Sequence, residues 1–209
     1  MRTKIQIKSV SGKLLFEHEC ENNSLKKAVT EAIKSNAVLI GADFSNTDLS
    51  GANLSGADFT GAYLFRANLS GADLIGANLF GADFTRANLS GANFTGADFT
   101  DANLFGADLT RADLTLVNLT GANFTDVNLT RANFTGAIKL PMHCRWSIGI
   151  TGDTIHIGWI KKTIDEWDEL FTSDEVLETK RGTTEFNQIQ ACYEAYKTYY
   201  NFLQKNKKP

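Results

Sequence analysis

The stretch Gly51-Ala52-Asn53-Leu54-Ser55-Gly56-Ala57-Asp58-Phe59-Thr60 holds two copies of one five-residue block, and this block decides the fold. Such blocks run without insertion from residue 36 to residue 135, which makes 20 blocks in 100 residues. The central residue is Leu or Phe in every block, and the residue two positions earlier is Ala in 17 of them. Asn or Asp separates these two positions in 18 blocks. Self-similarity at a short fixed period indicates a repeat architecture.

A period of five matches neither the 3.6-residue period of an α-helix nor the two-residue period of a flat strand. It matches a chain that turns a corner once in every block. The Ala and the large apolar residue are two positions apart, so both point to the same side of an extended segment. They therefore share a narrow interior, while the Asn or Asp faces outward and Gly eases the corner. Four corners close a coil, so the 20 blocks predict five coils in a tower about 24 Å tall.

This block resembles that of the pentapeptide-repeat family, and the resemblance covers about half of the chain. It implies a mainly β fold, a right-handed quadrilateral β-helix. The sequence departs from the core pattern at five positions. Ala is replaced at Thr47, Val117 and Val127, and the outward Asn or Asp is replaced at Val38 and Tyr63.

The segment before the repeat predicts a cap, because the open end of a solenoid exposes apolar surface. Within residues 1–35, alternating residues 3–8 and residues 14–17 predict a β-hairpin. Ser24 is a typical N-cap residue, and a helix is expected from it to about Lys34. The β-helix itself is assigned to residues 36–140.

Residues 141–209 predict a small α+β cap domain. Two strands are expected at residues 145–150 and 154–159, followed by a short helix that opens with the capping box from Thr163 to Glu166. A last helix is expected to begin near Thr184. Similar flanks accompany pentapeptide repeats in some bacterial and phage proteins.

Charge and composition exclude several classes of function. The net charge is −3 and no segment is strongly basic, so nucleic acid is not expected as a direct ligand. The N-terminus lacks a signal-peptide pattern and no apolar run reaches membrane length, which favours a cytoplasmic protein that does not bind membrane. Cys20, Cys144 and Cys192 have unrelated spacings and predict reduced thiols rather than a disulfide framework.

The sequence predicts no catalytic residue, no cofactor and no metal site. His143 and Cys144 could join His156 or Cys20 around a metal, but the spacing matches no zinc pattern. Neighbours in sequence rarely share catalytic geometry, which argues against Cys144 as a nucleophile beside His143. Residues 180–184 are interpreted as a basic turn before a helix rather than a phosphate loop.

Large residues at outward positions are the candidate partner-binding residues. With four blocks per coil, Tyr63, Phe65 and Phe105 fall on one side, Ile75 on the third and Phe80 on the fourth. Exposed aromatic residues often mark a protein interface, although these could instead pack beneath the caps or a loop. Arginines are expected to stack along edges, where they contact an acidic partner or keep the tower soluble. The candidates are Tyr63, Phe65, Phe80, Phe105, Arg66 and Arg86.

Three functions follow. The first is a non-catalytic scaffold that docks an unidentified protein through the side bearing Phe65 and Phe105; the resemblance implies a phage or mobile-element inhibitor of a host enzyme as one setting. The second, implied by the resemblance, is a DNA-mimicking binder of a type II topoisomerase (gyrase) of the quinolone-protection type. The eight outward aspartates fall two to a side, which does not favour an acidic stripe. The third is a self-associating structural protein, such as a homodimer. An enzyme confined to residues 141–209 is a fourth alternative.

Overall fold

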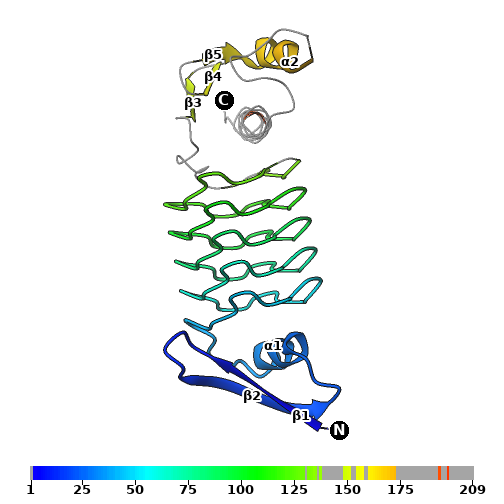
Figure 1. Ribbon diagram of the computed structural model, residues 1–209. Helices are drawn as coiled ribbons and strands as arrows, with labels where there is room; N and C mark the ends of the chain where they lie inside the picture. Colours follow the sequence, from blue (N-terminus) through cyan, green and yellow to red (C-terminus); the bar gives the residue numbers. More distant parts are fainter. Residues whose placement is uncertain are drawn as a thin grey trace, which may run out of the picture.

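The computed structural model describes residues 2–129, 131–135, 137, 148–151, 154–157, 160–172, 193 and 197. The N-terminal hairpin and helix lie at one end of a stack of coils, and helix α2 with the last strands lies beyond the other end (Figure 1). No helix among the described residues is long and apolar enough to span a membrane.

Parallel bridges between residues 20 positions apart stack the coils on one another. Backbone hydrogen bonds run up the tower at each bridge. The Leu54 N–H donates to the Asp73 carbonyl at 2.7 Å, and the Asp73 N–H donates to the Ala52 carbonyl at 2.9 Å. One coil therefore takes four blocks of five residues. The Ala and Leu or Phe positions of the blocks point inward and are almost all buried.

The large core residues form layers that alternate in type along the tower. The coil of residues 41–60 holds two phenylalanines and the coil of residues 81–100 holds three, whereas residues 61–80 and 101–120 contribute only leucines at the central position. Rings within an aromatic layer pack edge to face, as Phe94 does on Phe99 with centroids 4.9 Å apart and planes at 66°.

The residue at each corner has a left-handed backbone conformation. Glycine fills most corners, and Gly121 has φ of 72°. Side chains other than glycine lose about 1–2 kcal/mol in this conformation. Nine corners nevertheless carry such residues with φ between 55° and 61°, namely Asn36, Asn46, Arg66, Arg86, Asp101, Arg111, Leu116, Asp126 and Arg131.

The outward Asn or Asp of a block stabilises its own corner through hydrogen bonds. Oδ1 of Asp98 accepts hydrogen bonds from the Thr100 N–H at 2.9 Å and the Thr100 hydroxyl at 2.5 Å. Oδ1 of Asn88 accepts the equivalent bonds from Ser90 at 3.1 and 2.7 Å. Both residue types offer the same oxygen, which explains why Asn and Asp interchange along the repeat.

Replacing Asp98 by Asn is therefore expected to change the free energy of unfolding by less than about 0.5 kcal/mol. Replacing it by Ala is expected to cost about 1 kcal/mol or more, because both hydrogen bonds are lost. Urea denaturation of the two variants measures the difference. Equal losses would show that the charge, and not the Oδ1 acceptor, matters at this position.

Strands β1 (Arg2–Lys8) and β2 (Leu14–Glu21) form the antiparallel hairpin. Helix α1 (Leu25–Lys34) follows, and the Ser24 hydroxyl caps it by accepting from the Lys27 N–H at 3.3 Å. The predicted helix is found in full, whereas β2 extends well beyond the predicted strand at residues 14–17. The carbonyl of Lys8 accepts from the Asp43 N–H at 2.8 Å, which joins the hairpin to the first coil.

The C-terminal part contains strands β3 (Ile148–Thr151), β4 (Thr154–Ile157) and β5 (Ile160–Thr163), and helix α2 (Ile164–Thr172). The strands form an antiparallel sheet in the order β3-β4-β5. The sequence did not predict β5, because its two central lysines hide the strand pattern. Residues 145–147 and 158–159 and the start of the last predicted helix lie outside the described residues.

The predicted capping box opens α2. Glu166 accepts from the Thr163 N–H at 2.7 Å, and the Glu166 N–H donates back to the Thr163 hydroxyl at 3.3 Å. The bond from the Thr163 backbone, followed by that from its hydroxyl, lowers the pKa of Glu166. Trp167 is buried and donates its indole N–H to the Ile155 carbonyl at 2.8 Å, which holds the helix against β4.

Candidate partner-binding faces

Each ladder of bridges forms one face of the tower. The faces are numbered in chain order, and each is defined here by its outward residues. Face 1 carries Asp43, Tyr63, Asp83, Asn103 and Asn123; face 2 carries Asp48, Asn68, Asn88, Asp108 and Asn128; face 3 carries Asn53, Asp73, Asn93, Asp113 and Asn133; face 4 carries Asp58, Asn78, Asp98 and Asn118. Face 4 lies opposite face 2.

Exposed apolar side chains gather on face 4 and its two edges. Within the described part of the coils, six large apolar residues are exposed, and only Tyr63 belongs to another face. The other five are 43% to 64% exposed. They are Val38 and Ile40 at the foot of face 4, Ile75 and Leu116 at its edge with face 3, and Phe80 at its edge with face 1.

Apolar and acidic residues alternate along face 4. Val38 and Ile40 lie in its first block, Asp58 in the next, Phe80 in the third and Asp98 in the fourth, and Leu116 opens the fifth. With coils about 4.8 Å apart, apolar side chains recur about every 9.6 Å. The described blocks of this face contain no Lys or Arg. Its foot is hollowed by a cavity of about 230 Å³ between the end of α1 and the first two blocks.

Leu116 is the least expected of these residues. It occupies a left-handed corner, with φ of 57°, and its side chain is 56% exposed. A leucine there loses backbone energy, and more than half of its surface stays exposed in the isolated chain. Contact with a partner would supply the missing burial.

The aromatic residues predicted on face 1 are less exposed than the sequence indicates. Phe65 and Phe105 are half-buried, and only Tyr63 is exposed. The Arg66 guanidinium lies over the Phe65 ring, with Cζ 4.9 Å from the centroid. The ring therefore supports an arginine and presents little free surface, which the block pattern alone could not reveal.

The four arginines of the coils all border face 2. Arg66 and Arg86 lie one coil apart at its edge with face 1, and Arg111 and Arg131 lie one coil apart at its edge with face 3. All four are exposed. None takes part in the ion pairs found among the described residues. The sequence predicts that arginines stack along edges, and the fold shows that the two stacks enclose the same face.

The eight outward aspartates are distributed evenly, with two on each face. Their Oδ1 atoms accept hydrogen bonds from the backbone at the corners, as in Asp98. On Asp48 the hydrogen bonds from the Ser50 side chain and backbone lower the pKa. A continuous acidic stripe is not present on the described coils.

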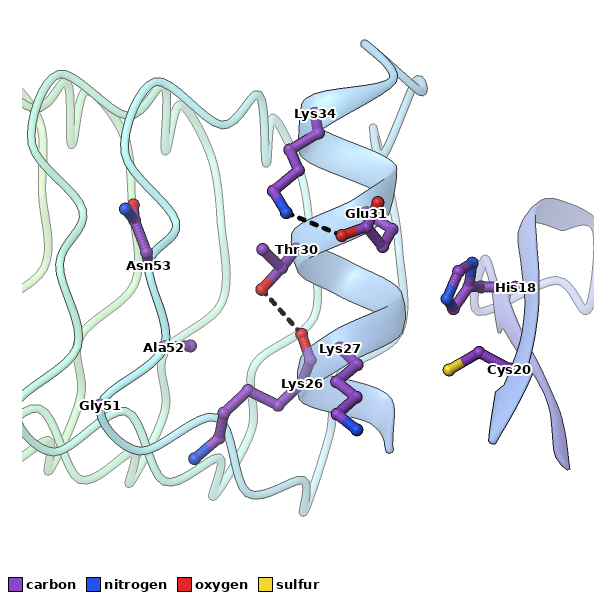
Figure 2. Close-up of a pocket in the computed structure, with 10 residues that line it drawn as sticks. All are labelled: His18, Cys20, Lys26, Lys27, Thr30, Glu31, Lys34, Gly51, Ala52 and Asn53. Carbon is purple, nitrogen blue, oxygen red and sulfur yellow. Dashed lines mark hydrogen bonds and ion pairs between the residues drawn. The ribbon is translucent and has the colours of Figure 1, made fainter. Parts of the chain in front are cut away.

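A cavity of about 480 Å³ lies between α1, β2 and the first coil, lined by His18, Cys20, Lys26, Lys27, Thr30, Glu31, Lys34 and residues 51–53 (Figure 2). Its amino groups already have partners. Lys34 pairs with Glu31 at 2.8 Å, Lys27 donates to the Asn22 carbonyl at 2.8 Å, and Lys26 donates to the Ser50 carbonyl. The hydrogen bond from Lys34 lowers the pKa of Glu31.

The described residues contain no group of three His, Cys, Asp or Glu that could hold a metal. His143 and Cys144 lie outside these residues, as does the basic turn at residues 180–184.

Comparisons with known proteins agree with the repeat. The family described as pentapeptide repeats matches residues 35–64, 62–101 and 97–136, in eight copies. This match implies a right-handed β-helix and confirms the predicted type of fold. A search of the curated proteins finds no match.

Several solved structures are similar to this chain. A pentapeptide repeat protein from the Arabidopsis thaliana thylakoid lumen is 31% identical, over 71% of this chain and 88% of that one, with a TM-score of 0.30. One from Nostoc PCC 7120 is 32% identical, over 49% of this chain and 84% of that one, with a TM-score of 0.35. QnrB1, a plasmid-mediated fluoroquinolone resistance protein, is 23% identical, over 48% and 54% of the two chains, with a TM-score of 0.28.

Proposed function

Because the chain belongs to the pentapeptide-repeat family, whose members are generally non-catalytic scaffolds, we propose that it binds a partner protein through face 4. The observation that carries this proposal is the gathering of five of the six exposed apolar side chains of the described coils on face 4 and its edges. Contiguous exposed apolar residues with polar neighbours are typical of protein interfaces.

The charge of face 4 indicates the chemistry of the partner. Asp58 and Asp98 lie between the apolar positions, and Asp101 lies at the edge with face 1. A partner that pairs apolar side chains with Lys or Arg would match this alternation and would be steered to the face by its charge. Of the binding residues predicted from the sequence, Phe80 belongs to this proposed surface. The other apolar residues of the surface are Val38, Ile40, Ile75 and Leu116.

We further propose that the flanks serve as caps, with the division at residues 1–35, 36–140 and 141–209. The N-terminal cap is supported by Ile7, Ala28, Val29 and Ala32, which are buried in one cluster with the core of the coils. The backbone bond between Lys8 and Asp43 extends the first coil into the hairpin. These contacts cover apolar surface that the first coil would otherwise expose.

The decisive experiment is a pull-down from bacterial lysate with mass spectrometry, using a variant of face 4. Ile75→Thr, Phe80→Thr and Leu116→Gly are combined, since each new residue is the one that stands one coil away. This triple variant is expected to keep the fold and to lose at least about 90% of the captured partner, which corresponds to a loss of about 1.4 kcal/mol in binding. The matched control is Phe65→Thr/Phe105→Thr, which changes the edge between faces 1 and 2.

Loss of the partner in the control alone would assign binding to the edge between faces 1 and 2, where the sequence predicts it, and would contradict the proposal for face 4. Equal capture by the wild type and both variants would exclude both faces.

The DNA-mimicking binder of a type II topoisomerase is the alternative. The resemblance to the family supports it, whereas the even spread of aspartates and the arginines around face 2 do not. Asp→Asn changes at Asp43, Asp58, Asp83 and Asp98 keep the corner hydrogen bonds and remove only charge. Protection of gyrase by the wild type that these changes abolish would replace the scaffold proposal with this alternative.

Self-association is the third candidate. Faces 2 and 4 are opposite and differ in charge, so a contact between face 2 of one copy and face 4 of the next would build an open array. Light scattering across a range of concentrations measures this. A mass that rises with concentration and falls in the face 4 triple variant would support this candidate.

A further inference from the structure

We propose that face 2 is a second docking surface, which binds an acidic segment of a protein. This inference does not rest on the proposal for face 4, because different residues carry it. The tower would then hold an acidic segment on one face and an apolar, basic one on the opposite face.

The arginines that border face 2 destabilise the isolated chain. Arg66 and Arg86 stand one coil apart, about 4.8 Å, so their positive charges repel each other. Both have left-handed backbone conformations, with φ of 55° and 58°, which glycine adopts without strain. Neither has a carboxylate partner among the described residues. An external carboxylate would relieve the repulsion and supply the missing ion pairs.

The same two arginines are held in position before any partner arrives. The guanidinium of Arg66 lies over the Phe65 ring at 4.9 Å. The aliphatic part of Arg86 lies against Gly106, where an added Cβ would be 3.5 Å from the Arg86 Cγ. Side chains restrained in this way lose less entropy when they bind. Phe65 is therefore assigned a positioning role beneath Arg66.

The surface between the arginines also offers hydrogen-bond donors. Oδ1 of Asn88 accepts from the Ser90 N–H and hydroxyl, and Oδ1 of Asn68 accepts from the Ser70 N–H at 3.1 Å. Because the corners use these oxygens, the amide N–H groups point to other contacts. The Asn68 amide already donates to Oδ1 of Asp48, one coil away, at 3.2 Å, so the Asn88 amide is the donor left for a ligand. Asn88 is exposed, and no acidic residue lies on face 2 in the blocks that begin at Arg66 and Arg86.

Carboxylates of a protein fit this surface better than the phosphates of a nucleic acid. Arginine pairs with carboxylates and phosphates alike through two parallel hydrogen bonds, so the arrangement of the cations decides between the two. A nucleic acid needs a continuous run of cations. Asp48 and Asp108 interrupt such a run on face 2, and the whole chain carries a net charge of −3.

The test measures fluorescence anisotropy of a labelled ten-residue polyglutamate peptide with the full chain. Arg66→Gly/Arg86→Gly is expected to weaken binding at least about tenfold, and binding by the wild type is expected to fall as salt rises. The same variant is expected to keep its melting temperature or to gain about 2–4 °C, because glycine removes the strain and the repulsion. The matched control, Lys8→Gln/Lys13→Gln, removes the same charge from the hairpin and is expected to bind normally.

Four results would overturn the inference. The first is that the wild type does not bind polyglutamate. The second is that both double variants bind it equally weakly, which would indicate that net charge alone drives binding. A duplex DNA oligonucleotide that binds more tightly than the peptide, through the same arginines, would make nucleic acid the occupant. A melting temperature lowered in Arg66→Gly/Arg86→Gly, with unchanged peptide binding, would assign the arginines a purely structural role.

Discussion

Replacement of Phe84 by alanine is expected to lower the free energy of unfolding by about 3–5 kcal/mol, the range for truncation of a buried aromatic residue. The Phe84 side chain is fully buried, and its ring lies 5.6 Å from that of Phe99. The change leaves a cavity in the layer of residues 81–100 and removes a ring contact worth about 0.5–1.5 kcal/mol. The backbone of the coil is fixed by hydrogen bonds above and below, so the layer cannot collapse to fill the space. Urea denaturation followed by circular dichroism measures the loss.

Two matched changes control this result. Phe80→Ala removes the same atoms from an exposed position and is expected to cost less than about 1 kcal/mol, in line with other surface substitutions. Phe84→Leu restores the residue found one coil away at Leu64 and Leu104, and is expected to cost less than about 1.5 kcal/mol. A loss below about 1 kcal/mol in Phe84→Ala would mean that the inward register of the repeat is not the one described.

The coils could be predicted from sequence because every block repeats the same physical constraint. A small residue and a large apolar residue, two positions apart and always in phase, allow one arrangement around a narrow core. Helix α1 was equally predictable from the sequence, since Ser24 marks its start and its apolar residues have helical spacing. The C-terminal sheet was predicted only in part, because β5 reads Ile160-Lys161-Lys162-Thr163 and lacks alternating apolar residues.

The candidate site was harder to predict from the sequence, because the exposure of a side chain depends on its neighbours one coil away and not on its own block. Phe65 and Phe80 occupy the same position in their blocks, yet Phe80 is exposed and Phe65 is half-buried beneath Arg66. The left-handed conformation of Leu116 could not be predicted either, since the sequence shows only that leucine replaces the usual glycine. Residues that break the repeat were therefore identified, but their roles required the fold.

The two proposed surfaces have a common physical logic. Non-glycine corners cost stability, and the corners at Arg66, Arg86 and Leu116 combine that cost with unpaired charge or exposed apolar surface. Binding surfaces commonly sacrifice stability in this way. The regular core tolerates the cost, because each coil contributes the same ladder of hydrogen bonds and the same buried layer.

Replacing Ala87 by leucine tests the core from the opposite direction and is expected to cost about 1–3 kcal/mol through overpacking. Ala87 is buried in the layer of residues 81–100, which already contains Phe84, Phe94 and Phe99. Valine occurs at the equivalent positions Val117 and Val127, so one added branch is accommodated in other layers. Leucine is one carbon larger, and in the aromatic layer it can be accepted only if a ring leaves its rotamer or the coil widens.

The matched control is Ala67→Leu, which places the same side chain one coil away, in the layer of residues 61–80 that contains only leucines. This variant is expected to lose less stability than Ala87→Leu, because leucine side chains can rearrange more easily than edge-packed rings. Thermal and urea denaturation of both proteins measure the difference. Equal losses would show that the backbone width of the coil, and not the aromatic layer, limits the interior. Wild-type stability in both variants would contradict a filled core, because the interior would then contain empty space. The burial of every central residue argues against such space.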